Sequence, residues 1–537
     1  MDTPADLESR TFDLLVVGGG INGAAIARDA ALRGLSVLLV EMADWGWATS
    51  SKSSKLAHGG LRYLENFDLA LVHEALQDRE RLLRQAPHLV RPLRFLYPLY
   101  PHIVARRTVR TGLWLYDLLS RGKSLPNRKY LRRDAALQEA PGLDPEGPAG
   151  AATFYDAQIQ QVERLVAEMA CDARRHGAVT LTRTRLDYLD FERREGRRAV
   201  TGAYLETEDG RHLRVRARAT VNATGCWVDE VLGALGDGAP PKVRKTKGAH
   251  VVVPRFLDVA FMVRAKDARS FFLLPWGEHC VVGTTDTDFA GDPGDAVATA
   301  ADVEYLTASA RRYFPDAPLD QVDFVYAGVR ALVNEQGVTE SNVTRRHILY
   351  DHAKRDAIDG LWTLQGGKIT TARTLAEECV DRIARAWGQA DLAKRHPTRE
   401  ARYPGGPAEP WDAFRAKAVA AAEKAVPVES AAHLVDTYGA RWNDVLDADR
   451  RPEAHRPIHP LDPNLPCEVT FAVHEEDAKH LGDYMLRRST LGLAADGNPQ
   501  AARRVLDWMA ELLGWSDKRC DEEWLRYVQE VRQFQVH

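Results

Sequence analysis

The sequence has few cysteines and no closely spaced pair of them. The six cysteines are scattered along the chain, at Cys171, Cys226, Cys280, Cys379, Cys467 and Cys520. Because no CxxC pair or other metal-like spacing occurs, neither a zinc site nor an iron–sulfur cluster is expected. Scattered cysteines in a long chain indicate reduced thiols in a cytosolic setting, not a disulfide framework.

Long apolar runs and an N-terminal leader pattern are also missing. No apolar run reaches the roughly 18–20 residues that a membrane-spanning helix requires. Residues 1–10, MDTPADLESR, are acidic and polar, without the basic start and apolar run of a secretory signal. We therefore expect a cytoplasmic protein that meets a membrane, if at all, from the surface.

Charge of one sign is not in excess. The chain has 72 basic and 76 acidic residues, a formal net charge of −4. A general nucleic-acid binder usually has a large basic excess, so no nucleic-acid partner is expected. A composition of 45% hydrophobic and 28% charged residues is ordinary for a soluble globular protein, and a length of 537 residues predicts more than one domain.

The clearest pattern that is present lies near the N-terminus. Residues 14–17 form a short apolar run, as in a strand buried on both faces. Glycines follow, and residues 21–32 then have the pattern of a helix of small residues that Gly34 ends. Residues 36–40 form a second buried strand. This order predicts a βαβ unit and, with it, an open parallel sheet.

The glycines between the first strand and the helix form a GxGxxG pattern. Gly18 allows the tight turn, Gly20 lets the backbone approach a pyrophosphate, and Gly23 lets the helix pack on the strand. The helix N-terminus offers N–H groups to phosphates. Glu41 ends the second strand, where a carboxylate accepts hydrogen bonds from an adenosine ribose. The pattern predicts dinucleotide binding. Glu41 disfavours NADP, and the position near the N-terminus favours FAD.

Two further turns have glycines at points where a cofactor can approach. TVNATGCW, residues 220–227, contains an A-T-G turn after an apolar strand, which many two-domain flavoproteins place at the cofactor. The alternative is an ordinary strand-ending turn. GGKITT, residues 366–371, precedes a helix, so its glycines and the helix N-terminus form a second site for negative charge, to which Lys368 adds a full positive charge. The alternative is a simple helix cap by a threonine.

Four ordered motifs and the C-terminal region share a resemblance to one family. The motifs are SSKLAHGGLRYLE after the first βαβ unit, GTTD at 283–286, YAGVR at 326–330 and GGKITT at 366–371. TFAVHEEDAKHLGDYMLRRSTLGL, residues 470–493, looks like that family's helical C-terminal domain. Together these segments resemble the FAD-dependent glycerol-3-phosphate dehydrogenases, from about residue 10 to the end of the chain.

The resemblance implies an α/β fold of three parts. These are a Rossmann-like FAD-binding domain of the glycine-oxidase-like flavoprotein class, an inserted antiparallel-sheet substrate domain and a C-terminal helical domain. The expected boundaries are 10–100, 150–245 and 346–398 for the FAD-binding domain, 101–149 for a basic-aromatic segment that is a candidate membrane contact, 246–345 for the substrate sheet, 399–411 for a linker and 412–537 for the helical domain.

The resemblance also implies a reaction and the residues that perform it. The expected reaction is oxidation of sn-glycerol 3-phosphate to dihydroxyacetone phosphate, with hydride transfer to FAD and a base for the hydroxyl proton. His250 is expected to take the proton because histidine has a suitable pKa, and Arg330 to fix and polarise the C2 oxygen, although the family pattern leaves open which of the two is the base. The phosphate requires cations. Substrate binding falls to Arg62, Tyr63, Arg345 and Lys368. No metal is expected.

The implied cofactor contacts lie in the glycine turns and in the segment that ends in SSKLAHGGLRY. Within that segment Lys55 is expected near the FAD phosphates, His58 and the two glycines against the isoalloxazine ring, and Arg62 toward the substrate phosphate. The full set is Gly18, Gly20, Gly23, Glu41, Thr49, Ser50, Ser53, Lys55, His58, Gly59, Gly60, Thr224, Gly225, Gly366, Gly367, Lys368, Ile369 and Thr370.

The electron acceptor is expected to be a quinone. The family contains quinone-linked membrane enzymes and oxygen-linked soluble oxidases, and the oxidases often have a mid-chain insertion that this sequence lacks. Residues 91–123 interleave arginines with aromatic and aliphatic residues, as an interfacial membrane contact requires. The alternative is a solvated helix face whose aromatic residues pack on the core. We expect a cytoplasmic protein peripherally attached to the cytoplasmic membrane.

Other functions remain as alternatives. An amine-oxidising flavoenzyme of the same fold would bind a carboxylate, for which one arginine suffices, whereas the cations named above favour a doubly charged phosphate. An oxygen-dependent glycerol-3-phosphate oxidase and a non-catalytic flavin-binding protein are further alternatives. The sequence leaves the oligomeric state open, including a homodimer.

Overall fold

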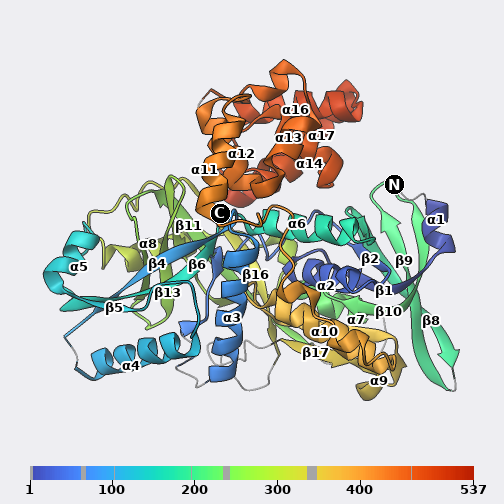
Figure 1. The fold of residues 1–537 in the computed structure, drawn as a ribbon, viewed down its shortest axis with the longest axis horizontal. Helices are drawn as coiled ribbons and strands as arrows, with labels where there is room; N and C mark the ends of the chain where they lie inside the picture. The colour runs from blue at the N-terminus through green and yellow to red at the C-terminus, as the bar shows by residue number, and fades with distance from the viewer. Residues whose placement is uncertain are drawn as a thin grey trace.

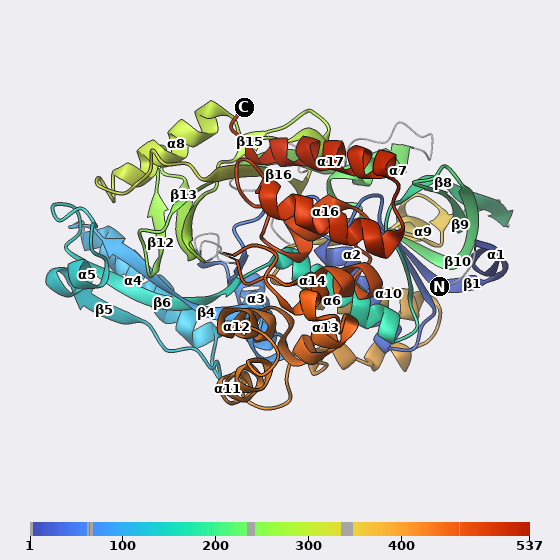
Figure 2. The same ribbon diagram turned by 90° about the horizontal axis from the view of Figure 1, so that it is seen from above.

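The computed structural model describes residues 4–61, 64, 68–101, 103–194, 196–233, 242–334, 347–460 and 462–537. Two β-sheets lie beside each other, and the C-terminal helices form a separate layer above them (Figure 1). Seen from above, the C-terminal helices lie across the middle of the molecule, over the region between the two sheets (Figure 2).

The first sheet contains the predicted βαβ unit. β1 pairs in parallel with β2 and with β10, and β10 pairs in parallel with β19, so the carboxyl ends of these strands meet at one edge. The described strands of this sheet are β1 (Thr11–Val17), β2 (Val37–Val40), β7 (Val179–Leu181), β8 (Thr184–Arg194), β9 (Arg197–Thr207), β10 (His212–Asn222), β17 (Ile348–Asp351), β18 (Ile358–Asp359) and β19 (Leu361–Gln365).

Helices α2 (Ile21–Leu32), α6 (Val162–Arg175) and α10 (Ala372–Ala386) cover one face of the first sheet. α2 has the bounds that the sequence predicts. Alanines supply much of the buried surface of α2, which lets it lie close to the strands and to both neighbouring helices. Side chains of β8, β9 and β10 pack against the other face. The remaining helices of this part are α1 (Pro4–Ser9), α7 (Val228–Gly233) and α9 (His352–Arg355).

The second sheet is mainly antiparallel. β11 pairs with β14 and β16, and β13 pairs with β12 and β14. Its described strands are β3 (Leu56–Ala57), β4 (Val90–Leu99), β5 (Lys129–Arg132), β6 (Gly150–Ile159), β11 (Val243–Pro254), β12 (Ala260–Arg264), β13 (Ser270–Trp276), β14 (His279–Gly283), β15 (Thr287–Asp288) and β16 (Phe324–Val333). α5 (Arg133–Glu139) and α8 (Ala300–Arg311) flank it.

Strand pairing corrects the predicted domain boundaries. The predicted boundaries place 10–100 and 150–245 in the FAD-binding domain and the whole substrate sheet in 246–345. In the structure β3, β4 and β6 belong to the second sheet, where β4 pairs with β6 from Val90↔Ile159 to Leu99↔Gly150 and in parallel with β12. An apolar pattern identifies a strand, but its partner is chosen by residues far along the chain.

The stretch at residues 91–123, in which arginines alternate with aromatic residues, forms two different elements. Residues 90–99 are β4, and α4 (Ile103–Leu119) follows, packed beside α3 (Leu69–Gln85). Phe95 and Tyr116 are fully buried, whereas Trp114 is 51% exposed and Leu118 is 42% exposed. Among the described residues, no helix combines the length and the apolar character needed to cross a membrane.

The C-terminal part is helical, as predicted. Its elements are α11 (Trp411–Ala422), α12 (Val428–Tyr438), α13 (Trp442–Ala448), α14 (Pro466–Glu475), α15 (Leu481–Asp483), a π-helical turn (Tyr484–Arg488), α16 (Pro499–Leu513), α17 (Asp517–Val531) and a 3₁₀ turn (Arg532–Phe534). Side chains of α14, α15, α16, α17 and the two turns share one hydrophobic core with β4, β11 and β16, whereas α11, α12 and α13 pack in a separate cluster. The C-terminal domain therefore covers one face of the second sheet.

Candidate active site

A cavity of about 520 Å³ lies between the two sheets. Its wall combines the glycine turn after β1, a loop at residues 41–54, and the turns that follow β10 and β19, together with side chains from β11 and β16. The volume is in the range of cofactor and ligand pockets. The site lies at the carboxyl ends of the parallel strands, where open α/β sheets bind their ligands.

The glycine turn has the geometry that a bound pyrophosphate requires. Gly18 has φ +108°, and a Cβ there would lie 2.6 Å from the carbonyl oxygen of Ala223. A Cβ at Gly23 would lie 1.8 Å from the carbonyl oxygen of Gly18, so only glycine lets α2 begin this close to the strand. Gly20 is the N-cap of α2 and supplies no capping side chain. Gly18 and Gly20 line the cavity, and the helix N-terminus favours negative charge beside them.

Glu41 lines the cavity and holds the glycine turn. Its Oε2 accepts the Gly19 N–H at 2.6 Å, and its Oε1 accepts the Ala43 N–H at 2.8 Å. Burial raises the pKa of Glu41, although these backbone hydrogen bonds oppose the shift. Each carboxylate oxygen has a second lone pair, so a contact with the ribose of a dinucleotide stays a prediction.

The loop at residues 41–54 contributes hydroxyl groups to the wall. Thr49, Ser50 and Ser53, which are predicted cofactor contacts, line the cavity, and so does Ser54. The Ser50 hydroxyl accepts the Ile21 N–H at 3.0 Å, and the Thr49 hydroxyl donates to the carbonyl of Val329 at 2.6 Å. The loop thereby connects the N-terminus of α2 with β16 of the second sheet.

The two later glycine turns close the wall of the cavity. Thr224 and Gly225 follow β10, and Gly366, Gly367, Lys368 and Ile369 follow β19; all six line the cavity. Gly367 has φ +103°, and a Cβ there would lie 2.9 Å from Nδ2 of Asn22 on α2. Thr370 is buried behind this turn, where its hydroxyl accepts the His58 N–H at 3.1 Å.

Lys55 is not part of the described cavity wall, so its predicted place beside the FAD phosphates stays a prediction. Its Nζ lies 3.1 Å from Oε1 of Glu163 on α6 and 5.0 Å from the centroid of the Trp276 ring. Both partners of this ion pair are buried. A buried ammonium needs a counter-charge, and the carboxylate on α6 supplies it on the side away from the cavity.

His58, Gly59 and Gly60 likewise lie outside the described cavity wall, and their contact with the isoalloxazine ring stays a prediction. A Cβ at Gly59 would lie 2.4 Å from the Leu76 side chain and 2.5 Å from the Tyr116 hydroxyl, so this glycine serves the packing of α3 and α4. The ring of His58 lies 6.2 Å from that of Phe272, and burial lowers the pKa of His58.

His250 lies in the cavity wall on β11. Its Nε2 is 2.8 Å from the Ser54 hydroxyl, and its ring stacks on Tyr326 with centroids 4.7 Å apart. Nδ1 is buried with no hydrogen-bond partner among the described residues. Burial, followed by the charges of Arg330 and Lys55, lowers the pKa of His250 well below its ordinary value. The imidazole is therefore neutral at pH 7 and able to accept a proton.

Arg330 lies on β16, near His250 in the same wall. Its Nη1 donates to Asp286 at 3.0 Å, and its Nη2 donates to the Thr284 hydroxyl at 3.0 Å and to the carbonyl of Thr285 at 3.3 Å. These bonds orient the guanidinium without covering the whole of it, since the residue still lines the cavity. Residues of the GTTD motif therefore hold Arg330 of the YAGVR motif in its orientation.

Of the predicted substrate-binding residues, the structure describes only Lys368. Lys368 lines the cavity. Arg62, Tyr63 and Arg345 lie outside the described residues. Lys52, which is not among the predicted site residues, also lines the cavity. Burial lowers the pKa of Lys52 to about 7. The only local signal for it is its place three residues before Lys55.

Comparison with known proteins extends these observations. The family model of the FAD dependent oxidoreductases matches residues 13–382, and the model of the C-terminal domain of alpha-glycerophosphate oxidase matches residues 396–520. A glycerol-3-phosphate dehydrogenase of Mycobacterium leprae is 38% identical and covers 96% of this chain and 87% of its own length. A D-erythritol 1-phosphate dehydrogenase of Brucella abortus is 35% identical and covers 90% of this chain and 95% of its own length.

A solved structure agrees with these sequence comparisons. The glycerol-3-phosphate dehydrogenase of Bacillus halodurans, complexed with FAD, has a TM-score of 0.80 at 26% identity, covering 99% of this chain and 98% of that one. Together the comparisons confirm the predicted fold class: an FAD-binding α/β domain, a second sheet and a C-terminal helical domain. They also confirm FAD as the cofactor of the family.

Proposed function

Because this chain belongs to the FAD-dependent oxidoreductase family, among the glycerol-3-phosphate dehydrogenases, we propose that it oxidises sn-glycerol 3-phosphate to dihydroxyacetone phosphate. The observation that carries the proposal is the meeting of His250, Arg330 and Lys368 in one cavity with the glycine turns of a dinucleotide site. A proton acceptor, an oriented arginine and a further cation suit an alcohol that bears a phosphate.

The cavity fits FAD. Gly18 and Gly20 leave room for a pyrophosphate at the N-terminus of α2, and Glu41 lies where a ribose would bind. Gly366, Gly367 and Lys368 offer backbone N–H groups and a positive charge at the other end of the wall. When bound, FAD supplies the acceptor for the hydride that leaves C2 of the substrate.

His250 is proposed to receive the proton of the substrate hydroxyl. Ser54 holds Nε2 and Tyr326 supports the ring face, so the imidazole has a defined orientation. Its lowered pKa makes it a weak base in the free protein. Burial is the largest cause of this shift and would persist in the complex, whereas a bound phosphate dianion would offset only the part that comes from the charges of Arg330 and Lys55.

Arg330 is proposed to polarise the C2 oxygen, and its pairing with Asp286 favours the charged guanidinium over a basic role. Lys368 is proposed to meet substrate or cofactor anions within the described wall. Arg62, Tyr63 and Arg345 remain proposed phosphate ligands. Arg62→Ala would then raise the substrate dissociation constant more than it lowers the reduction rate.

Anaerobic titration tests the substrate. We expect sn-glycerol 3-phosphate to bleach the visible absorption of the bound flavin. D-Erythritol 1-phosphate is the second candidate, because one of the relatives is named for its oxidation. Bleaching by glycine instead would support an amine-oxidising flavoenzyme, and bleaching by none of these compounds would contradict the proposed function.

A quinone is the proposed electron acceptor. The support is the lack of the long mid-chain insertion that oxygen-linked members of the family often have. The reduced enzyme should be reoxidised by a soluble quinone analogue much faster than by air-saturated buffer. Faster reoxidation by oxygen would identify an oxidase instead.

Peripheral attachment to the cytoplasmic membrane is proposed through the outer face of α4. Trp114 and Leu118 are exposed on this helix, together with Arg107, Arg110 and, just beyond it, Arg121. The helix lies at the edge of the molecule (Figure 1). Exposed apolar groups beside arginines suit an anionic lipid surface. The buried strand β4 does not contribute to the proposed membrane contact.

Sedimentation with anionic vesicles tests this contact. Trp114→Ala should weaken binding to the vesicles, and Tyr188→Ala, which changes an exposed aromatic residue on β8, should leave it unchanged. Equal recovery of wild-type protein with and without vesicles at low salt would contradict the membrane proposal. A homodimer is likewise proposed and is tested by light scattering.

A further inference from the structure

The loop at residues 41–54, here called the cofactor loop, contains two fully buried residues that are not part of the cavity wall. Asp44 and Trp45 are both fully buried, although Met42, Gly46 and Trp47 on either side line the cavity. A fully buried carboxylate in a loop needs a strong partner. The partners of both residues come from the C-terminal helical domain.

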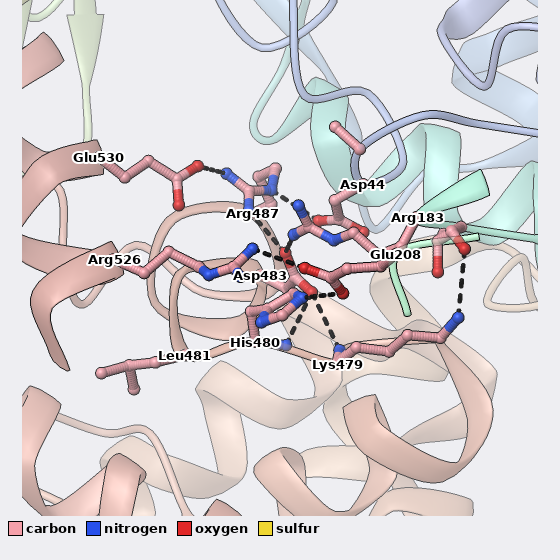
Figure 3. Close-up of polar contacts among 12 residues, drawn as sticks. Asp44, Arg183, Glu208, Lys479, His480, Leu481, Asp483, Arg487, Arg526 and Glu530 are labelled. Atoms are coloured by element: carbon pink, nitrogen blue, oxygen red, sulfur yellow. Dashed lines mark hydrogen bonds and ion pairs between the residues drawn. The ribbon is translucent and has the colours of Figure 1, made fainter. Parts of the chain in front are cut away.

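Asp44 is bound by two consecutive arginines of that domain. Its Oδ1 accepts Nη2 of Arg488 at 2.7 Å, and its Oδ2 accepts Nη1 of Arg488 at 2.9 Å and Nε of Arg487 at 2.6 Å. None of the three side chains is more than 4% exposed. Figure 3 shows the Arg487 side of this contact, where the cofactor loop meets the C-terminal domain; Arg487 is also paired to Asp483 and Glu530.

The backbone around the arginines explains how both reach one carboxylate. Residues 484–488 form a π-helical turn, in which the Ser489 N–H donates to the carbonyl of Tyr484 at 2.8 Å. Side chains of consecutive residues diverge less around this wider turn than around an α-helix, and such turns are frequent at functional sites. The side chains of Arg487 and Arg488 therefore both point at Asp44.

Trp45 joins the same loop to the glycine turn. A Cβ on Gly19 would lie 2.5 Å from the Trp45 ring, so the indole packs directly on the turn that faces the pyrophosphate. The indole N–H donates to Oδ2 of Asp477 in the C-terminal domain at 3.0 Å. The Gly46 N–H also donates to the carbonyl of Gly19 at 3.0 Å. A displacement of the loop would therefore displace the phosphate-binding turn.

We propose that Asp44 is a positioning residue through which Arg487 and Arg488 hold the cofactor loop in its FAD-binding conformation. The C-terminal helical domain is then part of the cofactor site although it supplies no side chain to the described cavity wall. Loss of the Asp44 charge leaves two buried guanidinium groups with one counter-charge fewer, which costs more than the loss of an exposed pair. The inference depends on FAD binding by the family and not on the proposed substrate.

The test uses the full chain, freed of FAD and then titrated with it. For Asp44→Asn we expect the dissociation constant of FAD to rise roughly tenfold or more, with altered visible circular dichroism of the flavin that remains bound. Asp436→Asn is the matched control. Asp436 binds Arg415 through two bonds, at 2.6 and 2.8 Å, and Arg91 of the second sheet through one at 2.8 Å. Asp436 does not contact the cofactor loop. The FAD affinity of the Asp436→Asn protein should therefore stay near that of the wild type.

Arg488→Lys keeps the charge but loses the two-pronged contact, and should weaken FAD binding by an intermediate amount. This variant decides the matter if Asp44→Asn does not fold. Wild-type FAD affinity in both variants, or an equal loss in Asp436→Asn, would overturn the proposal. Reduction by sn-glycerol 3-phosphate at saturating FAD is a separate measurement. Failure of the proposed substrate and failure of the proposed role of Asp44 therefore give different results.

Discussion

Nε2 of His250 and the hydroxyl oxygen of Ser54 lie 2.8 Å apart. This contact joins β11 of the second sheet to the cofactor loop, and both residues line the cavity. Because Tyr326 stacks on the same imidazole with an interplanar angle of 18°, the ring is held by a hydrogen bond at its edge and by an aromatic face. The proposed base is thus positioned by both halves of the site.

Replacement of His250 by glutamine should slow the chemical step. The amide keeps a polar group near Ser54 but cannot accept the proton, so flavin reduction should fall by about 10²–10⁴-fold. Stopped-flow reduction with sn-glycerol 3-phosphate measures this rate, and the substrate dissociation constant should change little. Ser54→Ala, which leaves the base in place, should have a smaller effect. An unchanged reduction rate in His250→Gln would remove His250 from the mechanism.

Arg330→Lys should be disruptive despite its retained charge. A lysine cannot reproduce the simultaneous bonds to Asp286 and Thr284. We expect a lower kcat with a smaller change in KM, because the arginine is proposed to act on the developing charge at the C2 oxygen. Steady-state kinetics with a quinone analogue provide both constants. A rise in KM alone would instead assign Arg330 to substrate binding.

Gly23→Ala should abolish FAD binding. The added Cβ would lie 1.8 Å from the carbonyl oxygen of Gly18, which the backbone relieves only by moving α2 away from the phosphate-binding turn. Gly112→Ala is the control, because a Cβ at that position in α4 meets nothing within 4 Å. Alanine in a helix interior should raise the free energy of unfolding by up to about 1 kcal/mol. Flavin content after purification and thermal unfolding distinguish the two variants.

His480 should make the contact between domains depend on pH. Its Nε2 lies 2.8 Å from Glu208 on the β9–β10 turn, and its Nδ1 lies 2.8 Å from Glu523 on α17, as Figure 3 shows for the first contact. Burial alone would lower the pKa of His480, but both carboxylates outweigh it and the pKa is raised. The hydrogen bond to His480 holds the pKa of Glu208 at about 2.

The sign of the pH dependence follows from the raised pKa. Stabilisation by His480 is complete below the ordinary histidine pKa of about 6.5 and is lost as pH rises through the higher pKa of the folded state. Unfolding by urea across this range should therefore show a decrease in stability that His480→Gln lacks. The neighbouring charges of Asp483, Arg183, Arg519 and Arg526 persist over this range. Identical pH profiles for the two proteins would contradict the prediction.

Local patterns in the sequence were sufficient for much of the first sheet. The βαβ unit and the glycine turns were predicted because each depends on requirements within a few residues: apolar periodicity, small side chains, or a backbone that only glycine allows. Gly23 illustrates this, since the atom that excludes a Cβ there is the carbonyl oxygen of Gly18 in the same turn. The cavity position of Lys368 followed from the same kind of motif.

Pairings between distant residues could not be predicted in this way. Lys55 and Lys52 stand in one short polar stretch, yet Glu163 draws the first away from the cavity and the second lines it. Nothing local to Asp44 indicates that Arg488, 444 positions later, is its partner. The sequence by itself determined the dinucleotide-binding unit and the family. Only the tertiary structure decided which strands share a sheet and which buried charges meet, because both depend on the packing of segments far apart in the chain.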